Sequence, residues 1–170
     1  MLLRSRPLAA LFVLGAIAGL PAPAIAEVVT ARPPIVVQAS IRGVALGMTP
    51  AEVREELGGP KSSVVTPNPI IGKVRIWRYA GLRIMFDGVG RGRTVLSVTS
   101  TSKGDRTAAG IGVGSRELEV QQLVRGVRCA TRYGYRSCML GGDKAGQITT
   151  DFSISGSGKV TRVTLSRVVD

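Results

Sequence analysis

The pattern that most constrains this chain is a short helix motif that occurs twice, each time ahead of alternating strands. Its first copy lies within LGMTPAEVREELGGP, Leu46–Pro60. Thr49 predicts the N-cap, and Glu52 is its capping-box partner three residues later. Pro50 suits the first helical position, where its missing N–H has no partner, and Gly58 predicts the end. We expect a helix of about two turns, which must pack on something to persist.

A second, weaker copy follows at a fixed distance. GVALGMTPAEV, residues 43–53, matches GIGVGSRELEV, residues 110–120, at an offset of 67, with Ser115 as the expected second cap. Downstream, TVLSVTSTS, residues 94–102, matches KVTRVTLSR, residues 159–167, at an offset of 65. The two offsets differ by only two residues. Such agreement is typical of a duplication with one small gap, so we predict two tandem units.

The segments after each helix motif alternate in the period of a strand. Leu82, Ile84 and Phe86 would share one face, and Arg83 and Met85 the other. The expected strands lie at residues 74–81, 82–88 and 93–101 in the first unit, and at 135–142, 147–155 and 159–169 in the second. We therefore predict an α+β fold of two tandem repeats, each a short helix packed on a three- to four-stranded antiparallel β-meander.

The front of the chain has the three parts of an export signal. Arg4 and Arg6 precede an apolar run, residues 8–20, and Ala24-Ile25-Ala26 forms a cleavage site. The run is too short to span a bilayer, and no Cys follows it for a lipid anchor. We expect residues 1–26 to be a signal peptide, and the mature chain to have no transmembrane segment and to be periplasmic, in the cell envelope or extracellular.

The rest of the chain divides into four expected segments. Residues 27–40 are predicted as an N-terminal tether, although their Ile35-Val36-Val37 run could instead add an edge strand. Residues 41–102 form repeat unit one, 103–109 a linker and 110–170 repeat unit two. Cleavage after residue 26 would lower the net charge from +12 to +10. A net charge of +10 still favours attraction to polyanions.

Two cysteines, Cys129 and Cys138, enclose eight residues. In an exported chain such a pair predicts a disulfide, worth about 2–3 kcal/mol by loop entropy. A redox site usually has closer spacing, and the chain has no His to complete a metal site. These two alternatives are therefore weaker.

Two groups of aromatic and basic residues are candidates for a contact surface, because Tyr, Trp and Arg are enriched in binding hot spots. The first is the disulfide loop, with Arg132, Tyr133, Tyr135 and Arg136 inside it and Arg128 just outside. The alternative, which the pattern slightly favours, is a solvated turn with one Tyr packed inward. The second group comprises Arg75, Trp77 and Tyr79 on one strand face. Core packing and sheet-face recognition both remain open for these residues.

The first unit also resembles a known family. Its pattern G-x-x-x-G-M-T-x-x-E-V-x-x-x-L-G-x-P, residues 43–60, and the strands after it are similar to the small α+β unit of the BamE (SmpA/OmlA) family. Two such units in tandem resemble the architecture of secreted β-lactamase inhibitor proteins. The resemblance implies a non-catalytic binding scaffold that uses its sheet face and loops.

Missing residue types narrow the possible functions. The absence of His removes the usual general base and the Ser–His and Cys–His pairs. Two segments are glycine-rich, residues 87–93 and 141–146, and neither has the P-loop order. We expect no enzyme activity, no cofactor and no metal. The leading expectation is an exported binding module with an unidentified protein partner. The alternatives are an electrostatic binder of anionic envelope polymer or nucleic acid, and an inhibitor of a secreted enzyme.

Overall fold

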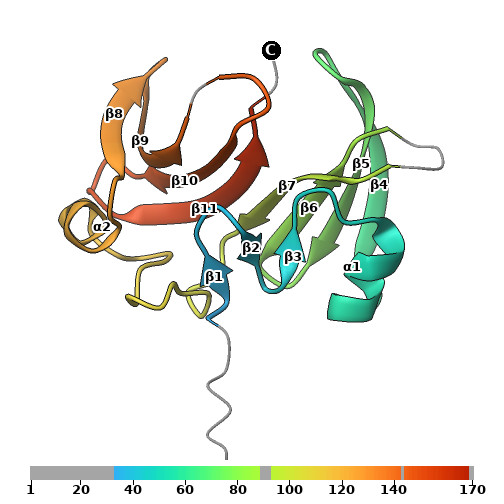
Figure 1. Ribbon diagram of the computed structural model, residues 1–170, viewed down its shortest axis with the longest axis horizontal. Coiled ribbons are helices and arrows are strands. Elements are labelled where there is room, and N and C mark those ends of the chain that lie inside the picture. Colours follow the sequence, from blue (N-terminus) through green and yellow to red (C-terminus); the bar gives the residue numbers. More distant parts are fainter. Residues whose placement is uncertain (1–32, 89–92, 143, 169–170) are drawn as a thin grey trace, which may run out of the picture. The chain divides into compact units, whose positions relative to one another are not determined.

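An eight-stranded antiparallel sheet dominates the computed structural model (Figure 1). The strand order across it is β4-β5-β6-β7-β11-β10-β9-β8. A three-stranded sheet, β1-β2-β3, and two short helices complete the fold. The structure describes residues 33–88, 93–142 and 144–168, so the expected signal peptide, residues 1–26, lies outside the described residues.

The elements of the large sheet are β4 (Ser62–Asn68), β5 (Gly72–Tyr79), β6 (Leu82–Phe86), β7 (Val95–Ser100), β8 (Arg128–Arg132), β9 (Tyr135–Gly141), β10 (Ile148–Ile154) and β11 (Val160–Arg167). The small sheet consists of β1 (Ile35–Val36), β2 (Ser40–Ile41) and β3 (Val44–Ala45). The helices are α1 (Pro50–Leu57) and α2 (Glu117–Leu123). Neither described helix is long and apolar enough to cross a membrane.

The predicted fold class of two tandem helix-on-meander repeats is wrong. The strands expected to end each unit, β7 and β11, pair with each other. Val163 lies opposite Ser100 and Ser166 lies opposite Ser97 at the two ends of the paired segment. Left apart, both would be edge strands with unpaired backbone groups. Their pairing satisfies those groups and merges all eight strands into one mostly β fold with a single core.

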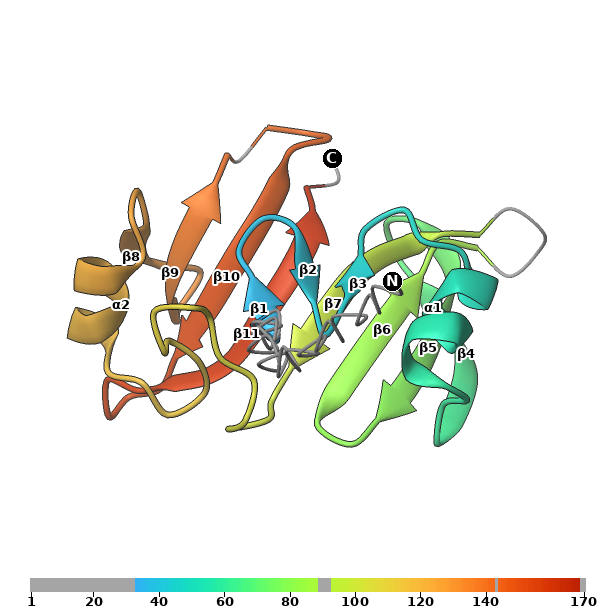
Figure 2. The same cartoon turned by 60° about the horizontal axis from the view of Figure 1, so that its bottom comes forward.

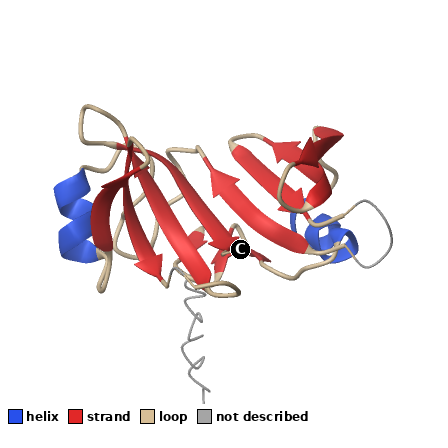
Figure 3. Cartoon of the chain, turned by 90° about the horizontal axis from the view of Figure 1, so that it is seen from above, coloured by secondary structure: helices blue, strands red, loops and turns tan. Residues whose placement is uncertain are grey.

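The helices and the small sheet cover one face of the large sheet, as Figure 2 shows. Val53 of α1 and Val120 of α2 are both fully buried, and Ile41 and Val44 of the small sheet are 1% and 0% exposed. They pack against inward-facing residues of the large sheet, including Ile84, Phe86, Val98, Phe152, Val163 and Leu165. Figure 3 shows the opposite face, which carries no helix. The two faces therefore have different roles.

The first helix forms where the sequence predicts it. The Thr49 hydroxyl accepts from the Glu52 amide at 3.4 Å, and the Glu52 carboxylate accepts from the Thr49 amide at 2.6 Å. The carboxylate accepts from the Thr49 hydroxyl as well, at 2.8 Å, and these two hydrogen bonds, first the one from the Thr49 amide, hold the pKa of Glu52 below its ordinary value. Gly58 ends the helix with a positive φ of 74°.

The second helix starts one residue later than expected. Arg116, not Ser115, is the N-cap residue, and its amide donates to the Glu119 carboxylate at 2.7 Å. The Ser115 hydroxyl is occupied elsewhere, because it accepts from the Gly112 amide and from Arg106.

Three segments expected outside the sheets are strands. Residues 35–36, within the expected tether, form β1, in keeping with the edge-strand interpretation, and Ile35 is 1% exposed. Strand β4 contains Pro67 and is not among the six expected strands, yet it lies at the sheet edge, where proline is tolerated. Strand β8 lies where a solvated turn was one of two interpretations, and it forms the other edge.

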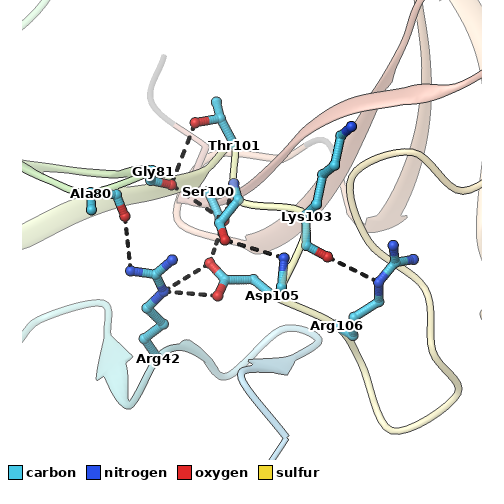
Figure 4. Close-up of polar contacts among 10 residues, drawn as sticks. Arg42, Ala80, Gly81, Ser100, Thr101, Lys103, Asp105 and Arg106 are labelled. Carbon is cyan, nitrogen blue, oxygen red and sulfur yellow. Dashed lines mark hydrogen bonds and ion pairs between the residues drawn. The ribbon is translucent and has the colours of Figure 1, made fainter.

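A buried carboxylate ties the small sheet to the large one (Figure 4). Asp105 is 5% exposed, and both of its oxygens accept from Arg42 Nε, at 2.8 and 2.9 Å. The Ser100 hydroxyl at the end of β7 also donates to it, at 2.5 Å. Arg42 reaches the Ala80 carbonyl as well, at 3.0 Å. Four chain segments thus meet at the Arg42–Asp105 ion pair.

Replacing Asp105 should destabilise the fold. We expect Asp105→Asn to lower the free energy of unfolding by about 2–3 kcal/mol, because it removes the charge that pairs with Arg42. Asp151→Asn is the matched control, since Asp151 is only half-buried and makes a single hydroxyl contact. Urea unfolding measures both variants. Equal losses would contradict a special role for Asp105.

The cap of α1 makes a smaller contribution. Thr49→Ala should lower the free energy of unfolding by about 1 kcal/mol, because the Glu52 amide loses its acceptor. Thr49→Ser keeps the hydroxyl and should lose much less. Chemical denaturation followed by far-ultraviolet circular dichroism measures the difference, and equal stability of the two variants would show that the hydroxyl does not cap the helix.

Candidate binding face

The face of the large sheet without helices is called the open face here, and one row of side chains crosses all eight strands on it. Each residue of the row lies directly opposite the next on a neighbouring strand, so all share one face. From β8 to β4 the row reads Arg128, Met139, Asp151, Thr164, Thr99, Arg83, Arg78 and Ser62.

Parallel rows extend this surface on both sides. One contains Ser137, Ser153 and Arg162 on β9, β10 and β11, and beyond it Tyr135 of β9 lies opposite Arg132 of β8. The other contains Thr149, Ser166, Ser97, Met85, Ile76 and Val64. Within these rows, every basic side chain is an arginine, and Asp151 is the one acid. The open face is therefore rich in hydroxyls and guanidinium groups.

The open face is hollowed along its middle. Three hollows of about 560, 370 and 310 Å³ share Arg162 as a lining residue. The first extends to Tyr135 and Gly134, the second includes Asp151 and Thr164, and the third reaches Arg78. Because neighbouring hollows also share Ser153 or Thr99, we treat them as one groove, called the open-face groove.

Hydroxyl groups form most of the polar contacts in this groove. Thr99 Oγ1 and Thr164 Oγ1 are 3.2 Å apart across the central strand pair. Ser153 Oγ donates to Asp151 at 2.9 Å and accepts from Arg162 Nε at 3.0 Å. The serine therefore lies between the acid and the arginine, and it links their orientations.

The three residues predicted on β5 lie away from the open face. Trp77 is 1% exposed, with its ring centroid 4.8 Å from that of Phe86 and the Arg54 guanidinium 4.6 Å above it. Tyr79 donates to the Gly58 carbonyl at 3.1 Å, and burial raises its pKa. Arg75 donates to Ser63 at 3.1 Å. Core packing, the first of the two interpretations, thus describes Trp77.

Four of the five predicted residues around the disulfide are exposed. Tyr133 and Tyr135 are 98% and 76% exposed, and Arg128 and Arg132 are exposed as well. Tyr133 and Gly134 form the two-residue tip between β8 and β9, with φ values of 50° and 79°. Positive φ at both positions is the pattern of a type I′ hairpin turn, and it is unusual for a bulky residue.

Arg136, the fifth residue, braces the hairpin to α2. Its Nε donates to both Glu117 oxygens, at 3.1 and 3.3 Å, and Nη2 donates to Glu117 as well. These hydrogen bonds raise the pKa of Arg136. Within the hairpin, the predicted disulfide between Cys129 and Cys138 is confirmed.

One cluster in the described residues has the composition of a metal site. Glu117 lies with Cys129 and Cys138, their ligand atoms all within 4.8 Å of one another. However, the two sulfurs are bonded to each other, so neither is a thiolate ligand, and the carboxylate pairs with Arg136. We therefore assign these groups a structural role.

Sequence reasoning missed Arg78, Arg162 and the hydroxyl rows as candidate site residues. Alternation along each strand does place Arg83 and Met85 away from the core. It does not show which strands lie side by side, so it cannot bring Arg83 next to Thr99 or assemble a groove.

Comparisons with known proteins add little. No family model matches the chain, and no curated protein of similar sequence was found. One similar solved structure is a DUF4309 family protein (YjgB) from Bacillus subtilis subsp. subtilis str. 168, with a TM-score of 0.46, 16% identity and coverage of 75% of this chain and 84% of that chain. Another is an extracellular protein containing an SCP domain from Bacillus anthracis str. Ames, with a TM-score of 0.44, 10% identity and coverage of 72% of this chain and 44% of that chain. Likenesses this distant carry no argument about function, and the resemblance to BamE-like units stays a prediction.

The conformation of Tyr133 gives a test of whether this residue serves folding. Tyr133→Asn creates an Asn-Gly turn, which suits positive φ at both positions, so we expect the free energy of unfolding to rise by about 0.5–1 kcal/mol. Thermal and urea unfolding measure the change. A loss of stability would show that the tyrosine ring makes stabilising contacts that outweigh the backbone strain.

Proposed function

We propose that this protein is a non-catalytic binding module that works outside the cytoplasm and contacts an acidic partner protein through its open face. The observation that carries the proposal is the composition of that face, where all five basic side chains are arginines. Protein interfaces are enriched in Arg, Tyr and Met and depleted in Lys. Tyr135, Met85 and Met139 lie on the same face.

The chemistry of arginine supports a protein partner. A guanidinium group is weakly hydrated and binds carboxylates through two parallel hydrogen bonds, so it loses less on desolvation than an ammonium group. The serine and threonine rows supply adaptable hydrogen bonds of the kind that paratopes use. Charge complementarity therefore favours a partner whose contact surface carries Asp and Glu.

The contents of the groove support a role without catalysis. Asp151 is the one carboxylate among the described residues that line it. Hydrolysis by paired acids needs a second one, and the chain contains no His to act as a general base.

Export rests on two features that agree. The disulfide between Cys129 and Cys138 is stable in oxidising compartments and rare in the cytoplasm. The leader pattern of residues 1–26 predicts secretion. We therefore propose that the partner is met in the cell envelope or outside the cell.

Charge reversal on the open face tests the proposal. Arg83→Glu combined with Arg162→Glu should abolish capture of a specific protein from the envelope and secreted fractions of the producing cell, as read by mass spectrometry. With the captured protein purified, we expect its dissociation constant to rise about 100-fold, because two charged hydrogen bonds are worth about 3 kcal/mol.

The matched control is Lys103→Glu combined with Arg125→Glu. Both residues are exposed and lie outside the open-face rows, so the net charge changes equally. Equal loss of binding in the control would show that net charge matters and that the open face does not.

The second candidate is electrostatic binding of an anionic envelope polymer or nucleic acid, which the net charge of +10 that remains after loss of residues 1–26 favours. Such binding falls steeply with salt. Retention on heparin that disappears at moderate salt, without salt-resistant capture of any protein, would favour this candidate over the first.

A further inference from the structure

Two arginines on the open face repel each other. Arg78 on β5 and Arg83 on β6 lie directly opposite on adjacent antiparallel strands, where like charges are destabilising. The ion pairs Arg42–Asp105 and Arg136–Glu117 involve neither of these arginines. Among the described residues, no carboxylate forms an ion pair with Arg78 or Arg83.

A third arginine joins this pair around one hollow. Arg162 of β11 lines the same 310 Å³ hollow as Arg78 and Arg83, together with Thr99 and Thr101. Its Nε donates to Ser153, which leaves the terminal guanidinium donors for a ligand. Three positive charges thus meet around a space that an anionic group can enter.

A hydroxyl donor lies in the floor of this hollow. Thr99 is 8% exposed, and its hydroxyl pairs with that of Thr164 at 3.2 Å. The pair contains two O–H protons, and one contact uses only one of them. The second proton can be donated to an oxygen of a bound anion.

The remainder of the groove limits where negative charge is favourable. Asp151 lines the adjoining hollow with Arg83 and Arg162 but does not line the hollow that contains Arg78. A ligand of uniform negative charge would be repelled when it passed Asp151. A ligand with its acidic groups at one end would not be.

We propose that Arg78, Arg83, Arg162 and Thr99 form a carboxylate-binding subsite for an acidic peptide segment that lies along the open-face groove. This inference rests on the proposed function and names the chemistry of the partner. From β9 to β5 the groove crosses five inter-strand steps, about 24 Å, which is the length of about seven extended residues. The acidic end lies over β5 and β6, and the rest of the segment passes Ser153 toward Tyr135.

Titration with two designed peptides tests the subsite. The first is a seven-residue peptide with three Glu at one end and Ser at the other positions, and the second has Lys in place of Glu. Nitrogen-15 NMR of the labelled protein follows the Thr99 amide and the arginine Nε–H signals. We expect saturable shifts at Thr99, Arg83 and Arg162 with the acidic peptide and none with the basic peptide.

Substitutions that remove one charge at a time sharpen the test. Arg83→Gln and Arg78→Gln should each raise the dissociation constant of the acidic peptide at least tenfold. Arg125→Gln, at an exposed site outside the open-face rows, should leave its affinity unchanged. Because each open-face substitution removes half of a repulsive pair, both variants should also be at least as stable as the original protein, so loss of binding cannot come from unfolding.

Three results would overturn the subsite. One is the absence of saturable shifts with the acidic peptide. Another is equal weakening by Arg125→Gln, and the third is tighter binding of a heparin hexasaccharide or polyphosphate at matched charge. The two proposals fail separately. If the peptide does not bind but capture of a protein still depends on the open face, the subsite is wrong and the proposed function stands. If the peptide binds and capture is independent of the open face, the proposed function is wrong.

Discussion

The pairing of β7 with β11 is the interaction on which the rest of the structure depends. Four residue pairs, from Ser97 opposite Ser166 to Ser100 opposite Val163, join two groups of four strands into one sheet. The join places Val98 beside Leu165 on the covered face and Thr99 beside Thr164 on the open face. Without it, the core would be divided, the central hydroxyl pair would not exist, and the groove would end at two strand edges.

The pairing of β7 with β11 also gives the sheet two contrasting faces. On the covered face, the small sheet lies over the centre and each helix contributes a buried valine to the core. The Asp105–Arg42 contact then fixes the small sheet to the end of β7 through Ser100. The open face needs no such cover, because its hydroxyls and guanidinium groups are favourable in water. It is therefore available for a partner.

Much of the local structure could be predicted from the sequence. The capping residues of α1, the cross-strand disulfide and the alternation of β6 and β10 all follow from patterns within about ten residues. The errors came from segments whose structure depends on distant partners. Strand β4 contains Pro67, which argues for a loop, yet an edge position gives a proline in a strand an acceptable environment. Ser is a common N-cap residue, but the hydroxyl of Ser115 already accepts hydrogen bonds from Arg106 and from the Gly112 amide.

The candidate site shows the same division between local pattern and tertiary structure. By itself the sequence determined the helices, most of the strands, the disulfide and which side chains of a strand face together, because helical and strand periods act between near neighbours. Only the tertiary structure decided that β7 pairs with β11, that Trp77 is a core residue, and that Arg78, Arg83 and Arg162 surround one hollow. Pairing between strands 65 residues apart depends on the whole chain. It depends on how much apolar surface the chain can bury and on how many backbone groups it can hydrogen-bond at the same time. No local pattern contains that information.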